Sequence, residues 1–189
     1  MGLLLDEINH QLSEQGLYIR SGEISIIDAS VIEANRNRPN KGKDGQPTQD
    51  PEASWNVKAG SDGKRKSTYG YKAHINVDED GFIKATDFTS GSVHDSNCFT
   101  GLLSGKESAV YADSAYRSEA HTDWVESKGV SNCILRRAYR NRPLSEEDKL
   151  FNRLHSGVRS IVERVFGVLK QHYGVLGILH PKRTLSSGM

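Results

Sequence analysis

Cysteine is scarce in this sequence, which has two in 189 residues, Cys98 and Cys133. Their separation fits neither a zinc-binding pattern nor a disulfide framework, so a reducing compartment is expected. Long apolar runs are also lacking, since none approaches the roughly 20 residues that a membrane-spanning helix needs. These absences predict a soluble cytoplasmic protein. Hydrophobic residues make up 35% of the chain, which is enough for one globular domain with a core.

An excess of charge of one sign is missing too. The 25 Lys and Arg residues nearly balance the 24 Asp and Glu residues, which gives a formal net charge of +1. Net charge alone therefore does not indicate a nucleic-acid partner, but the basic residues are clustered, and clustering is the stronger sign. The clusters are Arg36, Arg38, Lys41 and Lys43; Lys58, Lys64, Arg65 and Lys66; and Arg136, Arg137, Arg140 and Arg142.

Two short, β-branched apolar runs are typical of buried strands, and each carries an aspartate near its downstream end. They are residues 24–29, with Asp28, and residues 108–113, with Asp113. Their neighbours predict a mixed α/β sheet with helices packed on it. The other expected elements are a helix over 3–15, a polar loop over 35–54, a brief strand over 55–58, a loop over 60–67, a hairpin of 69–77 with 82–89, a helix over 118–127, a strand over 133–135 and a long helix over 145–173.

The two aspartates are candidates for one site, because ligand sites in open α/β sheets gather outside the carboxyl ends of strands. The long helix offers a third acid, Glu163, with Arg159 and Lys170 within about 40° of it around the helix axis. These three side chains form a polar stripe beside the apolar face. That face consists of Val158, Ile161, Val162, Val165 and Leu169.

Three converging carboxylates repel one another unless divalent cations neutralise them. Their hard oxygen ligands suit Mg²⁺ or Mn²⁺, and a pair of such ions supports phosphodiester chemistry. Taken singly, however, an aspartate after a strand is as well explained by a turn or a helix cap, and Glu163 by ion pairs along its helix. The spacing alone therefore leaves both interpretations open.

Four segments in this order and spacing resemble the successive motifs of DDE transposases of the insertion-sequence five group. The segments are residues 26–30 (IIDAS), 69–74 (YGYKAH), 110–116 (VYADSAY) and 159–167 (RSIVERVFG). The resemblance implies a ribonuclease-H-like mixed sheet flanked by helices. It also implies that Asp28, Asp113 and Glu163 form the catalytic triad and bind Mg²⁺, with Mn²⁺ as a possible substitute.

The same resemblance implies a function and partners. The expected activity is Mg²⁺-dependent phosphodiester hydrolysis and strand transfer on double-stranded DNA, namely transposon ends and target, by a homodimer associated with the nucleoid. The family's helix motif is Tyr, Arg, Glu and Lys; Arg159, Glu163 and Lys170 occupy three of these positions, and Ser156 stands at the tyrosine. The side chains expected to bind DNA are Arg159, Lys170, Arg164, Lys64, Arg65 and Lys66.

The resemblance also suggests a division of the chain. Residues 1–20 are expected to be the helical remnant of an N-terminal region, 21–175 the catalytic domain and 176–189 an irregular tail. Relatives generally continue beyond both ends, which indicates a truncated form. The alternative function is therefore a catalytically inactive DNA-binding or dimerisation remnant.

Several side chains have competing interpretations. Residues 76–87 are close to a calcium-loop pattern, but their flanks alternate like strands, so a hairpin turn is the better explanation. Trp55, Tyr69 and Tyr71 are candidates for stacking on bases, although core packing is expected for at least two of them. His74 and His94 are expected near sheet ends, where each is a candidate for a role in the site.

Overall fold

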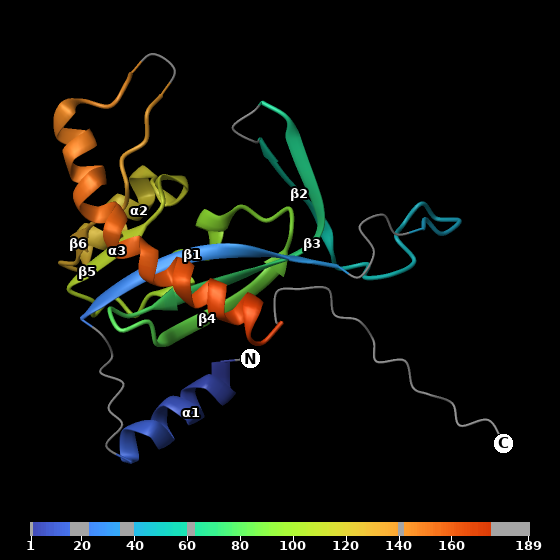
Figure 1. Cartoon of the computed structure of the whole chain (residues 1–189), viewed down its shortest axis with the longest axis horizontal. Coiled ribbons are helices and arrows are strands. Elements are labelled where there is room, and N and C mark those ends of the chain that lie inside the picture. The colour runs from blue at the N-terminus through green and yellow to red at the C-terminus, as the bar shows by residue number, and fades with distance from the viewer. Residues whose placement is uncertain (1, 16–22, 35–39, 60–62, 140–141, 175–189) are drawn as a thin grey trace.

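The computed structural model describes residues 2–15, 23–34, 40–59, 63–139 and 142–174. Arg36, Arg38, Arg140 and the tail over 176–189 lie outside these ranges. None of the helices within them is long and apolar enough to cross a membrane. The described part is a mixed sheet with helices on its faces (Figure 1).

The sheet runs in the order β2-β3-β1-β5-β6, and β4 pairs with β3 beside this path. Strands β1 and β3 are antiparallel, as are β2 with β3 and β3 with β4, whereas β5 is parallel to both β1 and β6. The strands are β1 (Ile24–Glu33), β2 (Ser54–Ala59), β3 (Arg65–Val77), β4 (Ile83–Ser90), β5 (Ala109–Ala112) and β6 (Ser131–Asn132).

The helices cover the two faces of the sheet unequally. Side chains alternate along a strand, so Ile26 packs against the long helix on one face, while Ile27 packs against the short helices on the other. Figure 1 shows the long helix α3 crossing β1. The helices are α1 (Gly2–Glu14), α2 (Glu119–Ser127) and α3 (Glu146–Gln171), and the 3-10 turns are η1 (Asp95–Cys98), η2 (Thr100–Leu102) and η3 (Ser114–Tyr116).

Local sequence signals explain where the helices begin. The Ser145 hydroxyl accepts a hydrogen bond from the Asp148 backbone N–H at the start of α3, and the Ser118 hydroxyl caps α2 in the same way. The first turn of α3 is acidic, which suits the positive end of its dipole. Val162 and Phe166 are buried at the centre of its apolar face, as the helical spacing predicts.

Strand β3 has a joint at Gly70, where its pairing changes. Residues 65–70 pair with β2, whereas residues 70–77 pair with β1 and residues 71–77 with β4. A Cβ atom at Gly70 would stand 2.0 Å from the carbonyl oxygen of Ile32, so no other residue fits there. The Gly91 N–H also donates to the Gly70 carbonyl, at 2.9 Å. Figure 1 shows β2 and its half of β3 projecting away from the rest of the sheet.

The predicted mixed sheet flanked by helices is confirmed, and so is the hairpin interpretation of residues 76–87. One oxygen of the Asp78 carboxylate accepts from the backbone N–H groups of Asp80 and Phe82 and so closes the turn between β3 and β4. This use of the acid explains the calcium-like pattern without an ion.

Three element boundaries were predicted wrongly. Strand β1 continues to Glu33 because β3 is long enough to pair with it throughout, so Asp28 lies within the strand and not at its exit. Arg65 and Lys66 belong to β3 and not to a loop. Strand β6 begins at Ser131, although the Cys133 N–H still donates to the Val110 carbonyl at 2.9 Å.

Candidate active site

The pairing of β1 with β5 places the two predicted aspartates side by side. Ile27 and Ala112 are register partners in this parallel pair, and Asp28 and Asp113 are the residues that follow them. Each carboxylate is oriented by the next backbone N–H, which comes from Ala29 for Asp28 and from Ser114 for Asp113. Two acids 85 positions apart in sequence thus share one edge of the molecule.

Helix α3 carries Arg159 and the third candidate acid, Glu163, which is one turn further along the helix. Its apolar face rests on β1 and β3, which turns Arg159 and Glu163 toward Asp28. The Arg159 guanidinium lies 3.6 Å from the Asp28 carboxylate and 3.7 Å from the Glu163 carboxylate. The Arg159 side chain is 14% exposed, whereas that of Glu163 is 60% exposed. The helix therefore presents a cation between two of the acids.

The electrostatics of Asp28 reflect all of these neighbours. Burial raises the pKa of its carboxyl group above the usual value, and the negative charges of Asp113 and Glu163 raise it further. The Ala29 N–H and the Arg159 guanidinium act in the opposite direction, but the net pKa remains raised. Burial and neighbouring acids both disfavour the negative charge of such a carboxylate. A bound cation offsets both effects, so the position is suited to one.

The set of donors fits a hard divalent cation by its chemistry, since it consists of carboxylate oxygens at a half-buried site. As the side chains stand, no three His, Cys, Asp or Glu residues among those described are close enough together to hold an ion. Arg159 stands between Asp28 and Glu163. The space between these two carboxylates is thus occupied by a cation of the chain itself.

Tyr116 was missed by the sequence interpretation, although it follows Asp113 closely. The short turn η3 folds it back into the core, where it is 1% exposed and packs against Phe99. Burial raises the pKa of its hydroxyl well above the usual value, and the charges of Asp28, Asp95 and Asp113 add to this effect. The sequence signal that could have identified it is a tyrosine shortly after an aspartate at the end of a strand. Tyr116 thus lies in the core, close enough to Asp28 and Asp113 for their charges to act on its hydroxyl.

The predicted DNA-binding residues other than Arg159 occupy three different places. Lys170 is exposed in the last turn of α3. Arg164 lines a groove with Leu5 and Gly81, on the side of α3 that faces α1 and the β3–β4 turn. Lys64, Arg65 and Lys66 lie at the start of β3 or just before it and are exposed. Of the basic residues in this prediction, only Arg159 forms an ion pair with a member of the acidic triad within the described ranges.

The two histidines differ in their surroundings. His74 is fully buried within β3, opposite Ala29, and its Nε2 is 2.8 Å from the Thr89 hydroxyl, so the prediction of a sheet end was wrong. His94 follows the end of β4, near the predicted sheet end, and caps the turn η1 by accepting from the Ser96 N–H.

The aromatic residues follow the core-packing interpretation. Tyr69 is 2% exposed, and Tyr71 packs against the same small cluster, whereas Trp55 remains 42% exposed beside Tyr69.

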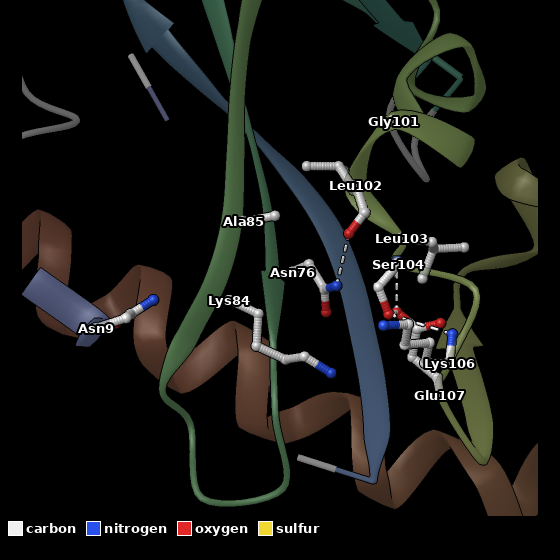
Figure 2. Close-up of a pocket in the computed structure, with 10 residues that line it drawn as sticks. All are labelled: Asn9, Asn76, Lys84, Ala85, Gly101, Leu102, Leu103, Ser104, Lys106 and Glu107. Atoms are coloured by element: carbon white, nitrogen blue, oxygen red, sulfur yellow. Dashed lines mark hydrogen bonds between the residues drawn. The ribbon is translucent and has the colours of Figure 1, made fainter. Parts of the chain in front are cut away.

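A pocket of about 530 Å³, lined by both apolar and charged residues, lies at the other end of β1 (Figure 2). The Lys84 amine donates to the Ile24 carbonyl at 3.0 Å, and the Asn76 amide donates to the Leu102 carbonyl at 2.7 Å. Glu107 accepts from the Ser104 N–H at 2.7 Å. Ser25 joins these groups, because its hydroxyl accepts from both Lys84 and Asn76. These contacts link β1 to β4 and to the segment after η2. The charged side chains of the pocket therefore stabilise the fold.

The chain is similar to known proteins of one kind. A family described as "Transposase DDE domain" matches residues 19–183. The transposase for insertion sequence element IS1106 of Neisseria meningitidis serogroup B is 31% identical over 182 residues, which is 90% of this chain and 62% of that protein. The chain thus spans less than two thirds of this relative's length.

Two solved structures are similar at a lower level. One is the Mos1 strand transfer complex, at 13% identity and a TM-score of 0.32, covering 82% of this chain and 56% of that chain. The other is the Mos1 transposase paired-end complex with left transposon end, at 11% identity and a TM-score of 0.32, covering 88% of this chain and 59% of that chain.

Proposed function

The chain belongs to the transposase DDE domain family, and on this basis we propose that it cuts DNA and transfers DNA strands at Asp28, Asp113 and Glu163. The observation that carries the proposal is the parallel register of Ile27 with Ala112, which brings the two aspartates together under α3. The expected reaction is hydrolysis of a phosphodiester followed by attack of the freed 3′-hydroxyl on a second strand.

The three carboxylates are suited to hold Mg²⁺, with Mn²⁺ in its place, and the ion would supply Lewis-acid stabilisation and an activated water or hydroxyl. The protein's own contribution is to position these groups. The backbone N–H groups of Ala29 and Ser114 orient the two aspartates. Arg159 supplies a planar donor of the shape that phosphate oxygens accept.

We further propose that the projecting β2–β3 hairpin binds DNA phosphates. Lys58 and Lys66 are register partners across this hairpin, and like charges directly opposite each other are destabilising. Arg65 is exposed nearby, and Trp55 presents a half-open ring on β2. A polyanion between the lysines relieves their repulsion, so the arrangement favours sequence-independent contact with a DNA backbone.

The partners and setting are part of the same proposal. Joining two transposon ends to one target requires two active sites, so we expect a homodimer on double-stranded DNA in the bacterial cytoplasm, at the nucleoid. Lys170, at the end of α3, extends the basic surface beyond the acids.

The proposal is tested with a nicking assay on double-stranded DNA that carries the ends of the insertion sequence. With Mg²⁺ the chain should nick this DNA, and Asp113→Asn should remove nicking while DNA binding, measured by anisotropy, is retained. Wild-type cleavage by Asp113→Asn would exclude this residue from the triad. Binding by both proteins without any cleavage would instead support a non-catalytic DNA-binding module.

A further inference from the structure

Arg159 occupies an unusual position for an arginine on a helix surface. Its side chain is 14% exposed, and its guanidinium is 3.6 Å from Asp28 and 3.7 Å from Glu163. Charge-assisted hydrogen bonds are normally about 2.7–2.9 Å long. Both separations are longer, so the guanidinium is shared between the two acids and is not locked to either of them.

The hydrogen bonding of Arg159 is also incomplete. Its Nε is buried and has no hydrogen-bond partner among the described residues. A buried donor without an acceptor is unfavourable, so charge and not hydrogen bonding holds the side chain here. The attraction comes from acids that repel one another, since Asp113 and Glu163 both raise the pKa of Asp28 while Arg159 lowers it.

We propose that Arg159 is an internal counter-ion for the acidic site, displaced when a divalent cation binds and then available to a DNA phosphate. The inference rests on the proposed function, because it assigns the same three acids to the cation. Once the acids are neutralised, the attraction that holds Arg159 is lost. Its planar donors then match a phosphate, so cation binding strengthens DNA binding, and the reverse holds by thermodynamic linkage.

The first test measures cation binding without DNA. The whole chain is titrated with MgCl₂ in a calorimeter and with MnCl₂ by water-proton relaxation. Arg159→Ala removes the competitor and should tighten cation binding by about fivefold or more, the lower end of typical coupling between sites. Arg159→Lys keeps the positive charge, so its affinity for the cations should lie between those of Arg159→Ala and the wild type.

Arg153→Ala is the matched control, because Arg153 is exposed on the same helix, away from the acids. It should bind both cations like the wild type. Unchanged or weaker cation binding by Arg159→Ala would overturn the inference. If Arg159→Ala does not fold, Arg159→Lys still tests the competition between Arg159 and the cation. Its cation affinity should be intermediate.

The second test measures the coupling with DNA. Affinity for a short mixed-sequence duplex is measured by anisotropy with and without MgCl₂ at constant ionic strength. Mg²⁺ should strengthen binding by the wild type and by Arg153→Ala by about fivefold or more, and this gain should disappear in Arg159→Ala. An equal gain in all three proteins would refute the coupling.

The two tests separate this inference from the proposed function. If the wild type binds Mg²⁺ and Arg159→Ala binds it equally well, the counter-ion role fails and the proposed chemistry stands. If the coupling is found but no DNA is nicked, the counter-ion role stands and the proposed activity fails. If neither protein binds Mg²⁺ or Mn²⁺, both are overturned.

Discussion

At the scale of single residues, the acids of the site have unequal surroundings. The side chain of Asp28 is 23% exposed and that of Glu163 is 60% exposed, because one acid sits on the central strand and the other on the outer side of a helix. Burial raises the pKa of Asp28, so its charged form is disfavoured in the folded protein relative to the unfolded chain. The charge of Asp28 therefore opposes the stability of the cation-free fold.

Replacement of Asp28 by a neutral residue should reveal the cost of its charge to folding stability. For an acid whose folded pKa lies above its usual 3.8, stability is lost as pH rises through the interval between the two values. At neutral pH, Asp28→Asn should thus raise the melting temperature of the cation-free protein by roughly 2–4 °C, which corresponds to about 1 kcal/mol in a domain of this size. Differential scanning calorimetry measures this change, and the same variant should lose DNA cleavage.

Glu163→Gln is the comparison for that experiment, because the exposed side chain should change the melting temperature less. A melting temperature that falls in Asp28→Asn would show that the charge stabilises the fold, contrary to the expected sign.

At the scale of elements, the position of Glu163 depends on how α3 packs against the sheet. Val162 is fully buried between the helix and the sheet, one position before Glu163. Val162→Ala should lower the free energy of unfolding by about 1–3 kcal/mol through lost burial and an added cavity. Urea denaturation tests this, with Leu154→Ala as the control. Leu154 is 65% exposed on the same helix, so its change should stay within about 0.5 kcal/mol. Equal losses in both variants would contradict the packing described.

The β2–β3 hairpin gives a second prediction at this scale. Lys66→Ala should reduce the slope of log affinity for DNA against log salt concentration by about 1, because one phosphate contact is lost. It should also leave the fold as stable or slightly more stable, since Lys58 loses its like-charged partner. Anisotropy titrations over a range of salt measure the slope. Lys128→Ala, at the end of α2, is the control; an effect as large as that of Lys66→Ala would argue against the hairpin.

At the scale of the whole molecule, buried polar groups make the fold sensitive to acid. Burial lowers the pKa of His74 below its usual 6.5, and Lys72 lowers it further, against the raising effect of Asp95 and Asp87. For Glu107, burial raises the pKa, but hydrogen bonds from Ser104 and the attraction of Lys84 outweigh it, so the net pKa is lowered below 4.5. Both groups bind protons less readily in the folded protein.

The expected result is a loss of stability as pH falls. The unfolded chain protonates His74 near pH 6.5 while the folded protein does not, so this contribution declines as pH falls below that value. The contribution of Glu107 declines at lower pH, below 4.5. Urea unfolding between pH 7.5 and 5.5 should show the first decline, and His74→Gln should flatten it. A pH dependence as steep in His74→Gln as in the wild type would exclude His74 as its source.

The sequence predicted the whole-molecule architecture well because periodicity and capping act locally. The apolar stripe of α3 and its cap at Ser145 lie where their spacing requires. Boundaries were less predictable, since the extension of β1 to Glu33 depends on pairing with a distant strand.

The candidate acids were chosen from the sequence, whereas the arrangement of the side chains around them was not predicted. That Asp28 and Asp113 are neighbours follows from the order of strands, whereas the place of Arg159 between two acids depends on how α3 turns on the sheet. Tyr116 escaped notice because its burial arises from a short turn with no periodic signal.

The joint at Gly70 has a consequence for how such a protein changes over time. Backbone meets backbone there, so the outer hairpin is anchored at one point, while the acids belong to strands on the inner side. The paired residues 55–59 and 65–69 of the hairpin lie on the other side of Gly70 from Asp28. If the hairpin binds DNA as proposed, its contacts can therefore evolve separately from the three acids.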